Sequence, residues 1–196
     1  DDGVIPHRLP AWARNQARDP QLAMAESQPS GARLLFATEA SRIELRGRAT
    51  RVRYEGAPPR PAGVFDLLVD GRRTRQAGLE AATVVSIDMT TGERRITRGE
   101  IGGVVFADLP PGPKTVELWL PHNETVELAE IRSDAPVRPV RDPRPVWVHH
   151  GSSISHGSNA ASPTGTWPAV AATRAGVDLI NLGLGGNALL DPFTAR

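Results

Sequence analysis

The spacing of hydrophobic and polar residues divides the chain into two parts with different patterns. Between residues 31 and 134 the apolar residues come in short runs, and some alternate with charged residues, as in SRIELRGRATRVRY. Alternation with a period of two is typical of strands that bury one face. Turn residues separate the runs, and Asp70-Gly71 is a strong signal for a two-residue hairpin. This part therefore predicts an antiparallel β-sandwich of about seven short strands.

The pattern changes at Val146. VWVHH (146–150) reads as a buried strand, and VDLINLGLGG (177–186) as a second strand that ends in glycines. Between them, TGTWPAVAATRAG predicts a helix that has Thr166 as its N-cap and ends at Gly176. A strand, a turn, a helix and a second strand form a βαβ unit with parallel strands.

Proline-rich segments flank these two parts. Residues 135–145 hold four prolines in APVRPVRDPRP, which indicates an extended linker. Residues 1–30 also hold four prolines and a short helical segment, AWARNQARD. We therefore divide the chain into an N-terminal arm (1–30), a β-sandwich domain (31–134), a Pro-rich linker (135–145) and the incomplete start of an α/β domain (146–196).

The composition of the chain limits the classes of protein to which it can belong. Hydrophobic residues make up 39% and charged residues 23%, as in globular proteins. No apolar run approaches the length of a membrane span, and arginines spread along a chain of net charge +1 predict no nucleic-acid partner. The absence of cysteine excludes disulfides, thiolate metal sites and cysteine nucleophiles. The start of the chain has neither a secretory signal nor a Met, so the cytoplasm and export both stay open, and the Arg, Ala, Gly and Pro usage suggests a GC-rich bacterial genome.

A serine follows the first strand of the βαβ unit in HHGSSIS. A nucleophilic serine needs a tight turn, a base that takes its proton, and N–H donors for the oxyanion. The glycine-rich NLGLGGN, at the end of the next strand, offers such backbone N–H groups. Because neighbouring parallel strands end at the same edge of a sheet, we expect this loop to approach Ser153.

GSSIS resembles the first signature block of the SGNH, or GDSL-type, hydrolases, and INLGLGGNA resembles their second block. TWPAVAA is similar to the Trp-Pro that opens the family's first helix. The resemblance implies that Ser153 is the nucleophile and that Gly186 is the glycine of the oxyanion hole. It places Asn181 as the asparagine at the strand end and Asn187 as a substrate-binding residue. Gly151 and Ile154 take the glycine and aliphatic positions of the first block. It further implies the first βαβ of a flavodoxin-like α/β/α domain, preceded by the β-sandwich.

The sequence departs from the family pattern in two respects. Ser152 stands where the family usually has Asp. Within the 196 residues there is no counterpart of the third block, Gly-x-Asn, or of the late Asp-x-x-His that supplies the base. None of the five histidines is expected to replace that base. We therefore expect the remainder of the hydrolase domain to come from a missing segment or a second chain, and this fragment alone to be inactive.

The resemblance implies a serine ester hydrolase that acts on carboxylic esters of small molecules or carbohydrates through an acyl-enzyme, with short acyl groups such as acetyl. An acyltransferase would use the same nucleophile. A different class stays open: a carbohydrate- or partner-binding module with an inert SGNH remnant, for which Tyr54 and Trp119 could line a binding face. No cofactor or metal is expected, because GLGG lacks the P-loop lysine and His149-His150 has no further ligand beside it.

Overall fold

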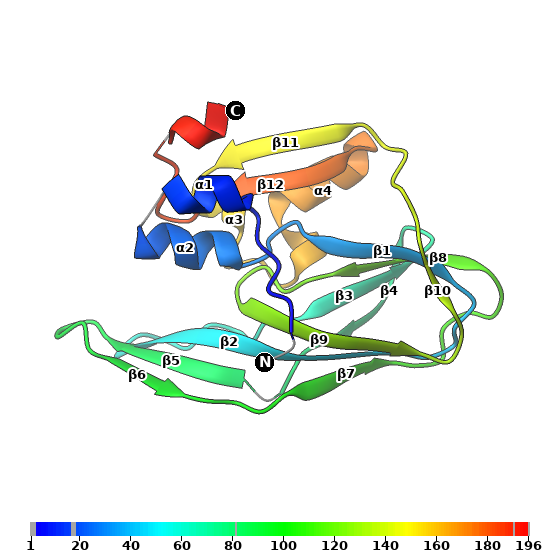
Figure 1. Cartoon of the computed structure of the whole chain (residues 1–196), viewed down its shortest axis with the longest axis horizontal. Helices are drawn as coiled ribbons and strands as arrows, with labels where there is room; N and C mark the ends of the chain where they lie inside the picture. Colours follow the sequence, from blue (N-terminus) through cyan, green and yellow to red (C-terminus); the bar gives the residue numbers. More distant parts are fainter. Residues whose placement is uncertain (1–2, 17–18, 81, 190, 196) are drawn as a thin grey trace.

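The computed structural model describes residues 3–16, 19–80, 82–189 and 191–195. The molecule is mostly sheet with few helices. Two five-stranded sheets lie against each other, and a two-stranded parallel sheet with short helices on either side lies above them (Figure 1). None of the described helices reaches the length and apolarity that crossing a membrane requires.

The upper of the two larger sheets has the strand order β10-β1-β8-β3-β4. Its strands are β1 (Arg33–Thr38), β3 (Phe65–Val69), β4 (Arg72–Ala77), β8 (Lys114–Trp119) and β10 (Val137–Pro139). Asp70 and Gly71 join β3 to β4 with φ values of 48° and 77°, so the predicted hairpin turn is confirmed. β10 lies in the Pro-rich segment and pairs only at the edge of the sheet, where a proline disrupts no ladder.

The lower sheet has the order β6-β5-β2-β7, and β9 also pairs with β2. Its strands are β2 (Ile43–Glu55), β5 (Ala82–Asp88), β6 (Arg94–Thr97), β7 (Gly102–Phe106) and β9 (Thr125–Ser133). β2 and β5 run parallel, so the prediction of purely antiparallel pairing is wrong for this pair. The reason is topological: after β2 the chain crosses to the upper sheet for β3 and β4, and returns in the same direction. β6 was not expected as a strand.

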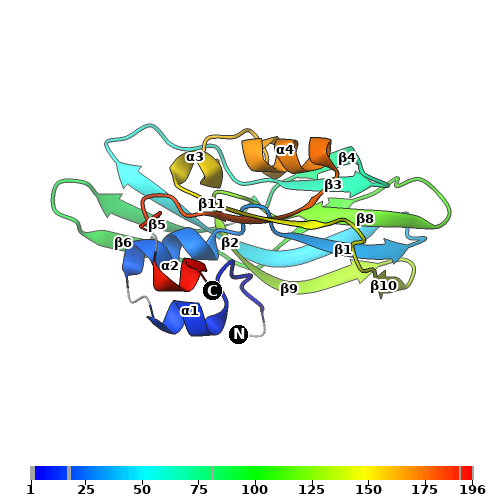
Figure 2. The ribbon, with the colours of Figure 1, turned by 90° about the horizontal axis from the view of Figure 1, so that it is seen from above.

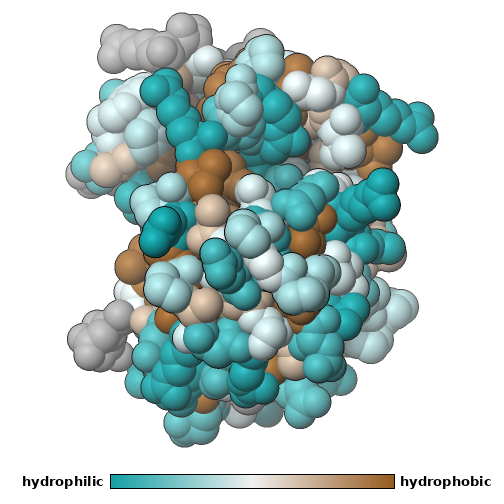
Figure 3. Space-filling view, turned by 90° about the vertical axis from the view of Figure 1, so that its right-hand side faces the viewer, coloured by the Kyte–Doolittle hydropathy of each residue, from teal (hydrophilic) through white to brown (hydrophobic). Residues whose placement is uncertain are grey.

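The main core lies between these two sheets. Its buried residues come from both, as the alternating pattern of β2 predicts: Ile43, Leu45 and Ala49 point inward. The other members include Phe36, Phe65, Leu67, Val104, Phe106, Val116, Leu118 and Val126. The end of the molecule seen in Figure 3 shows mostly hydrophilic side chains between small hydrophobic patches.

The N-terminal arm forms two helices, α1 (Ala11–Gln16) and α2 (Pro20–Ser27). Only the first was expected. The signal for α2 is present in the sequence, since Asp19 is its N-cap, accepts from Gln21 N at 2.8 Å, and is followed by a proline at the first helical position. A second apolar cluster joins the arm to the chain that follows β12: Leu9, Ala13, Leu22, Leu184 and Phe193, the last from the 3-10 helix η2 (Pro192–Ala195).

The uppermost layer is the parallel pair β11 (Val146–Gly151) and β12 (Asp178–Gly183). The connection between them contains α3 (Ser153–His156), the 3-10 helix η1 (Pro163–Gly165) and α4 (Trp167–Ala175). α3 and α4 lie on one side of this pair and the arm helices on the other (Figure 2). α4 ends at Gly176 with φ 66°, as predicted, whereas the Thr166 hydroxyl donates to Pro163 O and does not cap the helix.

The layers are held together by apolar and polar contacts. Trp119 of β8 packs with residues of α4 and β12. Asp66 of β3, fully buried, accepts from the backbone and the hydroxyl of Thr164 in η1 at 3.1 and 2.5 Å. Arg33 Nη2 of β1 lies 2.9 Å from Asp178 Oδ1 of β12. The βαβ segment is therefore packed directly onto the larger sheets.

Candidate active site

Ser153 lies immediately beyond the carboxyl end of β11. Ser152 is extended (φ −96°, ψ −151°), and Ser153 opens the single turn of α3, which closes when Gly157 N donates to Ser153 O at 3.0 Å. The first N–H groups of a helix have no partner within it, so the Ser153 N–H is left unused by α3. The Ser153 side chain is exposed.

Gly151 is required by close packing at this turn. A Cβ at Gly151 would collide with Ser155 Oγ, which is itself 2.8 Å from His149 Nε2. Gly151 does not adopt a positive φ, so the turn uses its lack of a side chain and not the left-handed region.

The glycine-rich loop after β12 lies against the Ser153 turn. Gly151 and Gly183 are register partners in the parallel pair. A Cβ at Gly185 would lie 3.8 Å from both Cα and Cβ of Ser153. Gly186 follows with φ 80°, beside the Gln21 side chain of α2. The structure thus brings Ser153 and the predicted oxyanion-hole segment together.

Asn181, in β12, connects the Ser153 turn and the glycine-rich loop by hydrogen bonds. Its Nδ2 donates to Ser155 O at 2.9 Å and to Ser30 Oγ at 3.0 Å, and its Oδ1 accepts from Gly183 N at 2.9 Å. Ser30 in turn donates to the His156 carbonyl at 2.7 Å. Asn181 is buried, so its part in the site is to fix backbone positions.

His156 is buried behind Ser153 and held in one neutral form. Its Nε2 lies 2.9 Å from the His122 carbonyl oxygen, which only a protonated nitrogen can approach as donor. Its Nδ1 then accepts from Gly185 N at 3.4 Å and faces Arg8 at 3.5 Å. Burial, with the nearby charge of Arg8, lowers the pKa of His156 to about 3. Both ring nitrogens are engaged, so His156 positions the glycine loop and is not available as a base.

Arg8 of the N-terminal arm lies beneath the same loop. Its Nη1 donates to Asn181 O at 3.1 Å and to Gly183 O at 2.7 Å, and its Nη2 donates to Ala25 O. Burial lowers the pKa of Arg8 to about 10, opposed by the charge of Glu26. No local sequence motif marks this residue, and the sequence pattern did not predict its role.

Two further candidate residues, Asn187 and His149, are held by contacts with residues other than Ser153. Asn187, expected to bind substrate, is buried, and its amide donates to Asp19 Oδ2 at 2.9 Å and accepts from Leu22 N at 3.2 Å. Asn187 therefore links the glycine-rich loop to the start of α2 by hydrogen bonds. His149 contacts Ser155, and its ring lies 4.8 Å from the Trp167 ring. Burial lowers the pKa of His149.

Two cavities open on either side of Ser153. One, of about 250 Å³, is bounded by Ser153, Gly185 and Gly186 on the βαβ side and by the arm and β2 on the other. The second, of about 400 Å³, is bounded by Ser153, Ile154 and Trp167. In the described ranges, no three His, Asp or Glu side chains gather closely enough to hold a metal ion.

Residues 144–195 match the model of the GDSL-like lipase/acylhydrolase family. This C-terminal part of the chain is therefore similar to the GDSL-like lipase/acylhydrolase family. Among solved structures, the chain is similar to a salicylyl-acyltransferase from a tetracycline biosynthetic pathway, with 29% identity and a TM-score of 0.77 over 96% of this chain and 49% of that one. A GDSL-like lipase candidate from Bacteroides ovatus has 23% identity and a TM-score of 0.65 over 96% of this chain and 53% of that one.

The chain spans about half the length of these two solved structures. Among curated proteins, none matches its sequence significantly. The resemblance seen in the sequence is thereby confirmed at the level of the family.

Proposed function

We propose that the complete protein is a serine esterase or acyltransferase in which Ser153 is the nucleophile. The observation that carries the proposal is the contact between the exposed Ser153 and the Gly185–Gly186 loop at the carboxyl edge of two parallel strands. The N–H groups of Ser153 and Gly186 are the proposed oxyanion donors. Donors fixed by the backbone stabilise the developing charge without reorganisation, which is the main requirement of acyl transfer.

In the proposed reaction the Ser153 hydroxyl gives its proton to a base as its oxygen bonds to the ester carbonyl carbon. The carbonyl oxygen becomes negative and is held by the two N–H groups. Collapse of this intermediate breaks the bond to the alcohol, which leaves with the proton from the base, and Ser153 stays acylated. Water, or an acceptor alcohol in a transferase, then repeats the sequence and restores the serine.

The base in this scheme is a histidine outside the 196 residues. In both His156 and His149, the ring nitrogen nearest the Ser153 turn already takes part in a hydrogen bond. We therefore propose the division made from the sequence: a β-sandwich domain (31–134) and the start of a flavodoxin-like α/β/α domain (146–196), completed by a further segment or a second chain. The apolar side chains of Val146, Val148 and Ile180 on β11 and β12 are exposed and would pack against that remainder.

The proposed substrates are carboxylic esters with short acyl groups, on small molecules or carbohydrates. Transfer to an acceptor is the second candidate, supported by the likeness to the salicylyl-acyltransferase. The two differ only in what attacks the acyl-enzyme, so product analysis with added alcohols separates them. A catalytically inert binding module would instead bind glycans and turn over no ester.

The test is covalent labelling of the complete protein with a fluorophosphonate probe, followed by peptide mapping. We expect the adduct on Ser153, and no adduct in Ser153→Ala. Ser152→Ala, which removes the neighbouring exposed hydroxyl, is the matched control and should label like the unmodified protein. Labelling of another residue, or none in a preparation that hydrolyses p-nitrophenyl acetate, would exclude Ser153 as the nucleophile.

A further inference from the structure

The smaller cavity beside Ser153 has a polar wall that does not belong to the GDSL-like segment. Six residues provide it: Gln21 of the arm, Arg51 and Tyr54 of β2, and Arg60, Asn123 and Glu124 from segments that connect strands. The volume of about 250 Å³ lies slightly below the ~300–1,000 Å³ of ordinary ligand sites. A group that enters it would be small and would meet hydrogen-bonding side chains.

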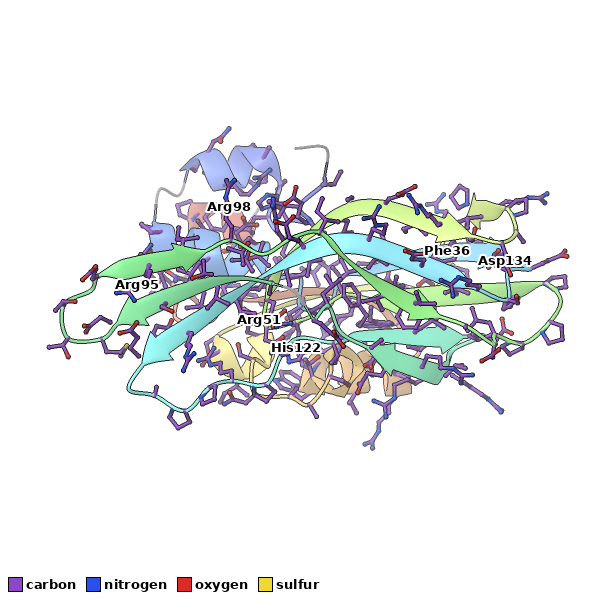
Figure 4. All side chains as sticks on the ribbon, turned by 90° about the horizontal axis from the view of Figure 1, so that it is seen from below. Phe36, Arg51, Arg95, Arg98, His122 and Asp134 are labelled. Atoms are coloured by element: carbon purple, nitrogen blue, oxygen red, sulfur yellow. The ribbon has the colours of Figure 1, made fainter. Side chains whose placement is uncertain are left out.

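One ion pair in this wall is held rigidly. Arg51 Nε lies 2.6 Å from Glu124 Oε1, which also accepts from Gly63 N at 2.7 Å. Arg51 Nη2 donates to the Leu79 carbonyl. The view from below shows Arg51 near the middle of the molecule (Figure 4). The two charges of this pair offset each other, so the pair fixes the shape of the wall without giving it a net charge.

Arg60 is the remaining cation of the wall. It borders both cavities that contain Ser153, and its guanidinium lies 6.0 Å from the centre of the Tyr54 ring. Within the part of the chain that the structure describes, no acidic side chain forms an ion pair with it. The charge of Arg60 makes the smallest of the contributions that lower the pKa of His156.

Two residues that line this cavity each hold a buried acceptor oxygen. Glu124 is 3% exposed, and its Oε2 has no partner among the described residues; the same holds for Asn123 Oδ1. Buried acceptors in native proteins are almost always satisfied, by a protein group, a water or a ligand. A ligand that satisfied these oxygens would have to bring a donor such as a hydroxyl.

We propose that this cavity binds the alcohol part of the ester, and that this alcohol is a small hydroxy acid. Its carboxylate pairs with Arg60, and a second hydroxyl donates to Asn123 or Glu124. This inference rests on the proposed function, since it takes Ser153 as the point of attack. The geometry favours a carboxylate because the planar guanidinium forms two parallel hydrogen bonds with it.

The experiment compares three acetyl esters with the complete protein at pH 7: 3-O-acetylglycerate, its neutral amide 3-O-acetylglyceramide, and 3-acetoxypropanoate, which lacks the second hydroxyl. We expect kcat/KM to be highest for the glycerate ester. Arg60→Gln should reduce it about tenfold, towards the value for the amide, because a hydrogen bond to a charged group is lost. Asn123→Ala should reduce the difference between the glycerate and propanoate esters.

Arg53→Gln is the matched control, since it removes the same charge from the exposed part of β2 outside the cavity. It should leave the preference for the anionic ester unchanged. Equal rates for the glycerate ester and its amide, or equal effects of Arg53→Gln and Arg60→Gln, would overturn the proposal. p-Nitrophenyl acetate turnover and Ser153 labelling report separately on the proposed function, because neither requires a hydroxy acid.

Discussion

Arg8 Nη1 donates to the backbone carbonyl of Gly183 at 2.7 Å, across 175 positions of the sequence. Gly183 ends β12 and precedes the loop that faces Ser153. The arm therefore contributes a partly buried cation to the support of that loop. Because a backbone shift of a fraction of an ångström weakens an oxyanion contact, the arm should affect the rate of the reaction as well as stability.

We predict that Arg8→Met in the complete protein lowers kcat for p-nitrophenyl acetate by about 10–100-fold, with little change in KM. This is less than the ~100–1,000-fold expected for removal of an oxyanion donor itself, because Arg8 acts only through the loop. Arg8→Lys should recover only part of the loss, because an ammonium lacks the planar fork that reaches several carbonyls. Steady-state kinetics measure the split, with circular dichroism as a check of folding. Arg14→Met, on α1 of the same arm, is the control. Arg8→Met with a normal kcat would show that the arm is not needed to position the loop.

A second prediction concerns the close contact at Gly151. Gly151→Ala should lower the free energy of unfolding by about 1–3 kcal/mol, as overpacking does, because its Cβ would overlap Ser155 Oγ. Ser155→Gly in the same molecule removes that oxygen and should recover part of the loss. Denaturant unfolding of the two single variants and the double variant gives the coupling energy. Gly102→Ala, whose Cβ would make an ordinary contact 3.5 Å from Leu79, should have little effect. Additive effects of the two substitutions would argue against the contact.

The stability of the protein should fall in acid because His156 is buried in its neutral form. Its pKa is lowered from 6.5 to about 3, so between these values the unfolded chain binds a proton that the folded chain does not. The contribution of neutral His156 to the free energy of unfolding is therefore complete above about pH 6.5. It is lost as the pH falls below that value, by about 1.4 kcal/mol per pH unit. Burial also lowers the pKa of His122, which adds in the same direction.

Urea unfolding at pH 7, 6, 5 and 4 measures this slope. His156→Gln, which keeps a donor for the His122 carbonyl, should make the slope shallower. If His156→Gln had the same slope as the unmodified protein, the acid sensitivity would come from other groups.

A fourth prediction concerns the contact between Asp66 and Thr164. Asp66 also accepts from Gln76 Nε2 at 2.7 Å, so both of its oxygens are used. Asp66→Asn replaces one acceptor by a donor that faces other donors, and should lower the free energy of unfolding by about 1–3 kcal/mol. Asp108→Asn, at an exposed position that asparagine tolerates, should change it by less than about 0.5 kcal/mol. Equal effects in thermal or denaturant unfolding would contradict the buried role of Asp66.

Local chemistry made much of the chain predictable. Asp70-Gly71 marks a turn because both residues adopt positive φ readily. Gly176 marks the end of α4 for a similar reason, and alternation in β2 marks its buried face. The Ser153 turn and the glycine-rich loop were predicted to meet because parallel strands end at one edge. α2 was missed, although Asp19-Pro20 is a sufficient signal for its start.

By itself, then, the sequence determined most of the strands, the helix α4 and the turn at Ser153, since backbone preferences act over a few residues. Only the tertiary structure decided that β5 runs parallel to β2, that Arg8 and His156 support the loop beside Ser153, and that Arg60 and Glu124 form a wall of the cavity. These relationships join residues separated by dozens of positions. The free energy of these contacts depends on how far each group is buried and desolvated, and only the complete fold sets that burial.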